Sequence, residues 1–180
     1  MVTKSHTYSA ELTWIGNTGK GTLDYRSYKR DHDVSGQGKP TIPGSSDPAF
    51  RGVAERWNPE ELLVVSLSQC HMLWYLDLAS RAGIVVLEYT DTPSGKMVEE
   101  VGGAGQFSEV VLRPRVVVSE PSMVEQAEAL HDKTHALCFI ARSVNFDVSH
   151  LPTTVVANAD PLGTPARESS ARPPTFLSGA

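Results

Sequence analysis

The sequence predicts an α+β fold in which a long central helix packs against antiparallel sheets. Three observations indicate this fold: an apolar helical stretch at residues 58–82, strand-like segments in runs before and after it, and a single further helical segment near residue 130. Runs of strands separated by single helices are typical of α+β folds rather than of doubly wound parallel sheets. We therefore expect one domain over residues 1–151, followed by a poorly ordered tail at 152–180.

Composition argues against several classes of partner. The formal net charge of −5 argues against nucleic-acid and membrane partners, because both require basic patches. No apolar run reaches the roughly 18 to 20 residues of a bilayer span, and residues 1–15 lack the apolar core of a signal peptide. We expect a soluble, cytoplasmic protein. In that compartment two cysteines are more typical of reactive or buried thiols than of a structural disulfide.

The N-terminal segment is predicted to form a hairpin followed by a loop. Residues 8–15 alternate polar and apolar side chains at the period of a strand, and Asn17-Thr18-Gly19 favours a turn. Residues 21–28 are predicted to return as the second strand. Residues 29–49 are rich in Gly, Pro, Ser and charge, so they are predicted to form a long surface loop.

The predicted central helix begins after Asn58 and stops at Gly83. Asn58 is a good N-cap, Pro59 suits the first helical position, and acidic residues follow at the positive end of the helix dipole. Apolar residues lie on nearly every side of this helix, which is typical of a buried helix. A single chain with few other helices can hardly cover every side, so the helix predicts a homodimer.

The second half of the domain is predicted to contain a meander, a helix and a last strand. Residues 84–119 are expected to form three strands, and Pro114 in the third favours a sheet edge or a bulge. The following helix is expected to be capped by Ser119 or Ser122 and to end at Cys138. A short strand at 143–148 and an extended piece at 153–157 complete the prediction.

Cys70 and Cys138 are the candidate chemical groups. Both could be ordinary core residues, since free cysteine is among the most buried residue types. Glu60 precedes Cys70 by ten residues on the same helix face, about 15 Å along the axis at about 1.5 Å per residue. Glu60 can therefore meet Cys70 only through a substrate or an arginine lying between them.

The histidines near the cysteines are candidate zinc ligands or catalytic bases. His131, His135 and Cys138 share one helix face and would suit zinc chemically. The pattern lacks a second C-x-x-C or an H-E-x-x-H, so we favour histidines on a partly exposed helix face and predict no metal site. His71 points about 100° away from Cys70 around the helix, so these neighbours cannot form a Cys–His dyad, and a dyad with His131 or His135 is the alternative left open.

The stretch NPEELLVVSLSQC at 58–70, followed by a second helix ending in CFIARSV, resembles the OsmC/Ohr family of osmotically inducible and organic-hydroperoxide-resistance proteins. The resemblance covers about residues 8–150. It implies an intertwined α+β homodimer with the long cysteine helices packed centrally between antiparallel sheets. It also implies reduction of organic hydroperoxides by a thiol, with electrons from a dithiol such as dihydrolipoamide and no cofactor.

Residue roles follow from the resemblance by position. Cys70 matches the peroxidatic cysteine, whose sulfenic acid condenses with the resolving cysteine, Cys138, into a disulfide. Glu60 matches the glutamate that pairs with a catalytic arginine, for which Arg51 is our choice. The alternatives for that arginine are Arg30, Arg26 and Arg56.

Phe139 departs from the family pattern, because many members have proline after the second cysteine. This departure indicates a distinct branch of the family. The alternative reading of the whole chain is a non-enzymatic protein on the same fold, which binds a small molecule or a metal, because a fold alone does not fix a function.

Overall fold

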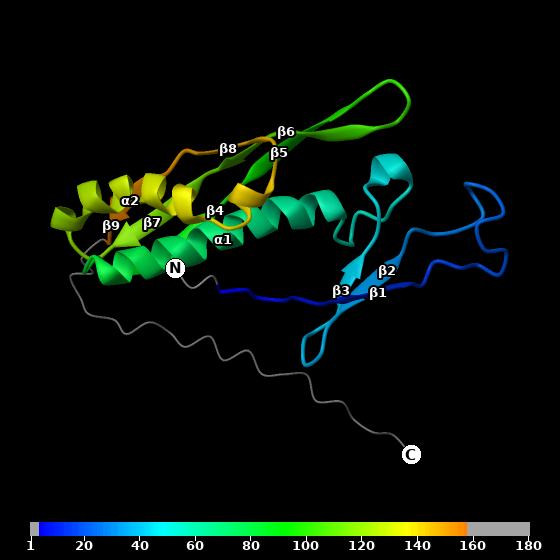
Figure 1. Cartoon of the computed structure of the whole chain (residues 1–180), viewed down its shortest axis with the longest axis horizontal. Helices are drawn as coiled ribbons and strands as arrows, with labels where there is room; N and C mark the ends of the chain where they lie inside the picture. The colour runs from blue at the N-terminus through cyan, green and yellow to red at the C-terminus, as the bar shows by residue number, and fades with distance from the viewer. Residues whose placement is uncertain (1–3, 158–180) are drawn as a thin grey trace, which may run out of the picture.

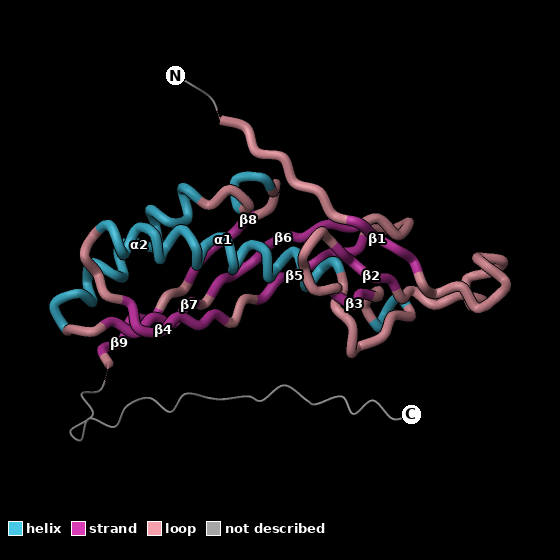
Figure 2. The backbone as a smooth tube through the Cα atoms, turned by 90° about the horizontal axis from the view of Figure 1, so that it is seen from below, coloured by secondary structure: helices cyan, strands magenta, loops and turns pink. Residues whose placement is uncertain are grey.

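The computed structural model describes residues 4–157 and contains two long helices and three three-stranded sheets (Figure 1). The longer helix, α1 (Pro59–Arg81), runs through the centre, and α2 (Val124–Leu137) lies alongside it. The strands of two sheets run along α1, whereas the N-terminal sheet lies beyond its start (Figures 1 and 2). Residues 158–180, which belong to the predicted tail, lie outside the described residues.

Helix α1 begins and ends where the sequence signals predict. The Asn58 side chain accepts a hydrogen bond from the Glu61 N–H at 2.7 Å, and the Glu61 carboxylate accepts one from the Asn58 N–H at 3.2 Å. This reciprocal capping box satisfies two backbone donors at the helix start. Gly83 follows the last turn with a φ of 72°, a left-handed conformation that glycine adopts without steric strain.

Only one face of α1 is fully covered by its own chain. The buried side chains on that face are Leu67, His71, Tyr75, Leu78 and Ala79. On another face Leu73 is 63% exposed and Leu76 is 36% exposed. By length and composition α1 is apolar enough to cross a membrane, but its contacts with α2 and the sheets make it the core helix of this fold.

The predicted N-terminal hairpin is wrong in its second strand. The observed antiparallel sheet has the order β1 (Glu11–Trp14), β2 (His32–Ser35) and β3 (Ile42–Gly44), so β2 and β3 lie in the segment predicted as a loop. Residues 21–27 form turns and bends instead, and of the predicted strand Tyr28 alone pairs, in an isolated antiparallel bridge with Asn17. The Asn17 side chain accepts from the N–H groups of Gly19 and Gly21, and the Asp24 carboxylate accepts from the Arg26 N–H. These local bonds replace a strand ladder.

The predicted three-stranded meander is four strands shared between two sheets. These strands are β4 (Val86–Asp91), β5 (Ser94–Glu99), β6 (Gly105–Leu112) and β7 (Pro114–Val118). The long predicted third strand breaks at Arg113, and Pro114 begins β7. Because β7 is the central strand of its sheet, Pro114 marks the start of a strand rather than a sheet edge.

Two of the three sheets are mixed, whereas the sequence predicts purely antiparallel sheets. Strand β8 (Asp147–His150) pairs in parallel with β6, and β9 (Thr153–Val156) pairs in parallel with β7. The last predicted strand, at 143–148, lies further toward the C-terminus as β8. The reason is that residues 141–143 form a 3-10 turn, η3 (Ala141–Ser143). The extended piece expected at 153–157 is β9, which carries the folded part of the chain past residue 151.

Helix α2 starts without the predicted serine cap. A 3-10 turn, η2 (Pro121–Met123), leads into it, and no side chain caps either start. The Ser122 hydroxyl lies 3.5 Å from the Glu120 carboxylate, and the Ser119 hydroxyl lies 3.6 Å from the Met123 sulfur. Cys138 is the C-cap residue of α2, where the sequence places it.

The core has two clusters that divide α1 between them. One surrounds Leu67 and contains Val110, Leu112 and Val148 from β6 and β8. The other surrounds Tyr75 and Ala79, and it is completed by Ile84, Val116, Val118 and Ala127. Cys70 and His71 lie on α1 between these clusters, where α2 also packs against the helix.

Candidate active site

The structure brings the two cysteines together. Cys70 lies in the middle of α1 and is partly buried, whereas Cys138 is 1% exposed at the end of α2. Both are free thiols, and Cys70 lies near enough to Cys138 to affect its ionisation. The Ala141 N–H also donates to the Cys138 sulfur at 3.4 Å, which fixes that sulfur against η3.

The two thiols have different environments. Burial raises the pKa of Cys138 to about 11, and the neighbouring Cys70 thiol contributes in the same direction. At neutral pH Cys138 is therefore almost entirely protonated, and a protonated thiol is a poor nucleophile. Cys70 is the more accessible of the two, so an external oxidant would reach it first.

Apolar side chains surround the thiols. Trp74, one turn after Cys70 on α1, packs edge to face against Phe139 with ring centroids 5.3 Å apart. Phe139, the residue that departs from the family pattern, is 65% exposed. Leu73, beside Trp74 on α1, is also exposed, so apolar residues near the two cysteines in sequence are partly uncovered within a single chain.

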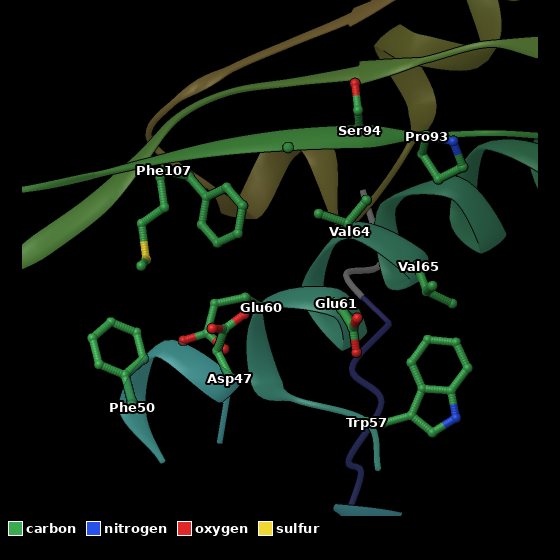
Figure 3. A pocket seen from close by; sticks show the side chains of 12 residues that line it. Asp47, Phe50, Trp57, Glu60, Glu61, Val64, Val65, Pro93, Ser94 and Phe107 are labelled. Atoms are coloured by element: carbon green, nitrogen blue, oxygen red, sulfur yellow. The ribbon is translucent and has the colours of Figure 1, made fainter. Parts of the chain in front are cut away.

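Glu60 lines a separate cavity at the start of α1. The cavity has a volume of about 440 Å³, and Cys70 is not among its lining residues. Figure 3 shows Glu60 between the rings of Phe50 and Phe107 on one side and Trp57 on the other. One Glu60 carboxylate oxygen, Oε2, is buried without a hydrogen-bond partner among the described residues. An unpaired buried carboxylate oxygen is costly, so this position suits a cationic donor.

No candidate arginine contacts Glu60 within residues 4–157 of one chain. Arg51 follows the 3-10 turn η1 (Pro48–Phe50) with a φ of 66°, and its guanidinium lies 5.8 Å from the Tyr25 ring. Arg56 pairs with Asp33 at 3.5 Å. The remaining alternatives, Arg26 and Arg30, line a different cavity together with Arg51.

A buried histidine pair lies beside the thiols, contrary to the expectation that His131 is partly exposed. His71 is 0% exposed and His131 1% exposed, and their Nε2 and Nδ1 atoms are 3.0 Å apart. The His131 ring also stacks on Tyr75 at 4.3 Å between centroids. One feature of the sequence indicates that His71 is buried, because His71 shares its helix face with the apolar Leu67 and Tyr75. The contact with His131 arises only from the packing of α1 on α2.

Both buried histidines are neutral at physiological pH. Burial, and to a smaller extent the neighbouring His131, His150 and His135, lower the pKa of His71 to about 3. Burial and His150 lower the pKa of His131 to about 4, against a smaller opposite effect of Asp132. Among the described residues, no group of three or more His, Cys, Asp or Glu side chains is arranged to hold a metal ion.

Comparisons with known proteins agree with this arrangement of helices and sheets. A family model described as OsmC-like protein matches residues 52–150. An OsmC-like protein of unknown function from Vibrio cholerae O1 biovar eltor is 33% identical, with a TM-score of 0.74 over 82% of this chain and 99% of that chain. Among curated proteins none matches. The chain therefore belongs to the OsmC-like family.

Organic hydroperoxide resistance proteins share the fold at lower identity. The one from Elizabethkingia anophelis, solved with thiocyanate bound, is 19% identical, with a TM-score of 0.61 over 85% of this chain and 99% of that chain. The one from Legionella pneumophila is 16% identical, with a TM-score of 0.60 over 84% of this chain and 100% of that chain.

Proposed function

We propose that the protein is a cytoplasmic, homodimeric peroxidase that reduces organic hydroperoxides with Cys70 and regenerates through a disulfide to Cys138. The observation that carries this proposal is the contact between an accessible thiol and a buried, protonated one. The OsmC-like family includes neighbours named organic hydroperoxide resistance proteins, which supports the choice of substrate class.

The proposed reaction has two steps, formation of a sulfenic acid and formation of a disulfide, before a dithiol reduces the protein. Cys70 first gives up its thiol proton, and the thiolate attacks one peroxide oxygen, so that the O–O bond breaks and Cys70 becomes a sulfenic acid. The departing alkoxide takes up the proton that Cys70 released and leaves as the alcohol. The Cys138 sulfur then attacks the Cys70 sulfur, and the hydroxyl leaves as water with the proton that the Cys138 thiol carried. The high pKa of Cys138 keeps this proton in place until it is needed. A dithiol then reduces the disulfide by exchange.

Glu60 acts on Cys70 across a dimer interface in this proposal. The two residues are about 15 Å apart along one helix, so they cannot meet within a single chain. Two α1 helices that cross antiparallel near Val65, midway between these positions, would set Glu60 of the partner subunit beside Cys70. The partly uncovered face of α1 supports such a crossing.

An arginine held by Glu60 completes the proposed site, and Arg51 is our choice for it. A guanidinium forms charge-assisted hydrogen bonds with a carboxylate and with a thiolate, so it would stabilise the ionised Cys70 and orient the peroxide. The unpartnered buried oxygen of Glu60 is the acceptor that such an arginine requires.

A second function, a non-enzymatic small-molecule carrier, is favoured by one observation. The cavity of about 440 Å³ beside Glu60 combines apolar walls with carboxylates, a combination typical of ligand pockets. Titration of both thiols with and without an organic hydroperoxide separates the two functions. Rapid loss of both thiols favours the peroxidase, whereas unchanged thiols favour the carrier.

Cysteine variants test the peroxidase directly. We expect the Cys70→Ser protein to lose dithiol-dependent reduction of cumene hydroperoxide, because the attacking sulfur is gone. The Cys138→Ser protein should still react once, leaving a sulfenic acid that dimedone traps on Cys70, and should then turn over slowly. Ser80→Ala, on the same helix, is the control. Equal turnover by the Cys70→Ser and wild-type proteins would refute the proposal.

A further inference from the structure

A second cavity, of about 530 Å³, lies in the loop between β1 and β2 and is strongly cationic. Its charged lining residues are Lys20, Arg26, Lys29, Arg30 and Arg51, with Asp24 as the one carboxylate among the residues that line it. Five of the sixteen Lys and Arg residues of the chain thus gather at one site, although the net charge is −5. This concentration requires an explanation beyond solubility.

Arg30 is held rigidly at this cavity. Its guanidinium lies 4.2 Å from the centroid of the Tyr25 ring and 4.1 Å from that of Tyr28. It also donates hydrogen bonds to the Tyr28 carbonyl at 2.6 Å and to the Tyr25 carbonyl at 2.8 Å. Two cation–π contacts and two charge-assisted bonds fix the charge before any ligand arrives.

The other cations are not neutralised by the chain itself. Within residues 4–157, the ion pairs involve Arg56, Arg81, Arg115 and His150, and none of the five cations at this cavity takes part. Asp24 is engaged by the backbone N–H of Arg26 at 2.7 Å. Arg51 lies 5.8 Å from the ring that Arg30 also contacts, in a left-handed backbone conformation that is uncommon for a residue with a side chain.

Like charges held this close repel one another, and a bound anion relieves the repulsion. We propose that this cavity binds a small phosphate-bearing molecule. Guanidinium groups match the geometry of phosphate oxygens, and several cations around one cavity favour an anion with more than one charge.

The ligand is a small molecule rather than a polyanion surface. The basic residues line a cavity of limited volume, while the chain as a whole is acidic and would be repelled by nucleic acid or by an anionic membrane. Neither cysteine lines this cavity. Arg51, our choice for the arginine beside Glu60, does line it, so the test measures binding rather than peroxidase activity and uses variants that keep Arg51.

The test measures pyrophosphate binding by calorimetry. The variant Lys20→Gln, Arg26→Gln, Lys29→Gln leaves the Arg30 contacts intact, and we expect it to weaken binding by about tenfold or more, a loss of roughly 1.4 kcal/mol or more in binding free energy. The matched control, Lys39→Gln, Lys96→Gln, Lys133→Gln, removes the same charge at exposed positions elsewhere. It should stay within about threefold of wild type, and added salt should weaken wild-type binding.

Circular dichroism and thiol titration confirm that both variants are folded. The Cys70→Ser protein should bind pyrophosphate as wild type does, which separates this proposal from the proposed peroxidase. No binding to wild type, or equal weakening in both charge variants, overturns the proposal. Sedimentation with phosphatidylglycerol vesicles, but not phosphatidylcholine vesicles, that depends on Lys20, Arg26 and Lys29 would also contradict it and assign these cations to a lipid surface.

Discussion

Cys138 differs from Cys70 through its surroundings rather than its chemistry. The end of α2 buries Cys138 to 1% exposure, and this burial raises its pKa to about 11. An asymmetric pair suits a two-step reaction, since one sulfur must meet a peroxide while the other waits for the sulfenic acid. The sequence places both cysteines at helix positions, but their contact and unequal burial depend on how α2 folds back on α1.

The buried pair of His71 and His131 predicts a loss of stability in acid. An unfolded histidine has a pKa of about 6.5, whereas the folded values are about 3 and about 4, so the unfolded state takes up protons first as the pH falls. The contribution of the neutral histidines to the free energy of unfolding should therefore be fully present above pH 6.5 and should decline toward pH 4. Between pH 7 and pH 5 we expect a loss on the order of 2 kcal/mol for each histidine.

Urea unfolding at several pH values measures this effect. The His131→Phe protein should lose less stability between pH 7 and pH 5 than wild type, because one of the two titrating groups is removed. His6→Gln, at an exposed position, is the control and should leave the slope unchanged. Stability that is equal at pH 7 and pH 5 in the wild type would contradict the assignment of neutral buried rings.

At the scale of helices and strands, the predictions that succeeded are those that depend on capping and turn residues adjacent in sequence. The bounds of α1 follow from Asn58, Pro59 and Gly83, which act on adjacent backbone and need no tertiary partner. The strand predicted at 21–28 fails because side-chain bonds from Asn17 and Asp24 fold that segment into turns. The parallel pairings of β8 and β9 join segments distant in sequence, which alternation of side chains cannot reveal.

The sequence predicts the residue types of the candidate site but not the contacts between them. The family motif identifies Cys70, Cys138 and Glu60, but it gives no distance between them. The histidine pair was missed because one ring comes from each helix and only their packing brings them within 3.0 Å. The arginine stays a prediction, since within residues 4–157 of one chain none of the candidates reaches Glu60.

The capping box of α1 yields a prediction for Asn58. This residue is 5% exposed, and its side chain and backbone both bond to Glu61. We expect Asn58→Ala to lower the free energy of unfolding by about 1 to 2 kcal/mol, since a buried cap and its reciprocal bond are lost. Urea denaturation measures the change, with Asn145→Ala at an exposed position as the control. A change no larger than that of the control would contradict the role of the cap.

At the scale of the whole molecule, the uncovered face of α1 predicts an obligate dimer. Burying a leucine side chain fully stabilises a structure by about 1.5 to 3 kcal/mol relative to exposure, and Leu73 and Leu76 lack most of this burial in one chain. The first β-strand adds exposed apolar groups, with Leu12 at 68% and Trp14 at 43% exposure. A second copy of the chain would cover these surfaces and complete the Cys70 site.

Sedimentation at sub-micromolar concentration tests this expectation. Wild type should sediment at twice the chain mass of 19.5 kDa, with no folded monomer. Leu73→Asp would bury a charge at the interface, so we expect it to dissociate or unfold the dimer and to abolish peroxidase turnover. Leu151→Asp, at 61% exposure and outside α1, is the control. A folded 19.5 kDa wild-type species with native thiol reactivity would contradict the dimer.

The central claim is that Cys70 and Cys138 form one redox pair, and a single-turnover titration tests it most directly. The reduced protein is mixed with one equivalent of an organic hydroperoxide and digested under conditions that block free thiols, and the peptides are analysed by mass spectrometry. We predict stoichiometric loss of both thiols, one disulfide between Cys70 and Cys138 of the same chain, and its reversal by a dithiol. Persistence of both free thiols, or oxidation of Cys70 without the disulfide to Cys138, would contradict the redox pair.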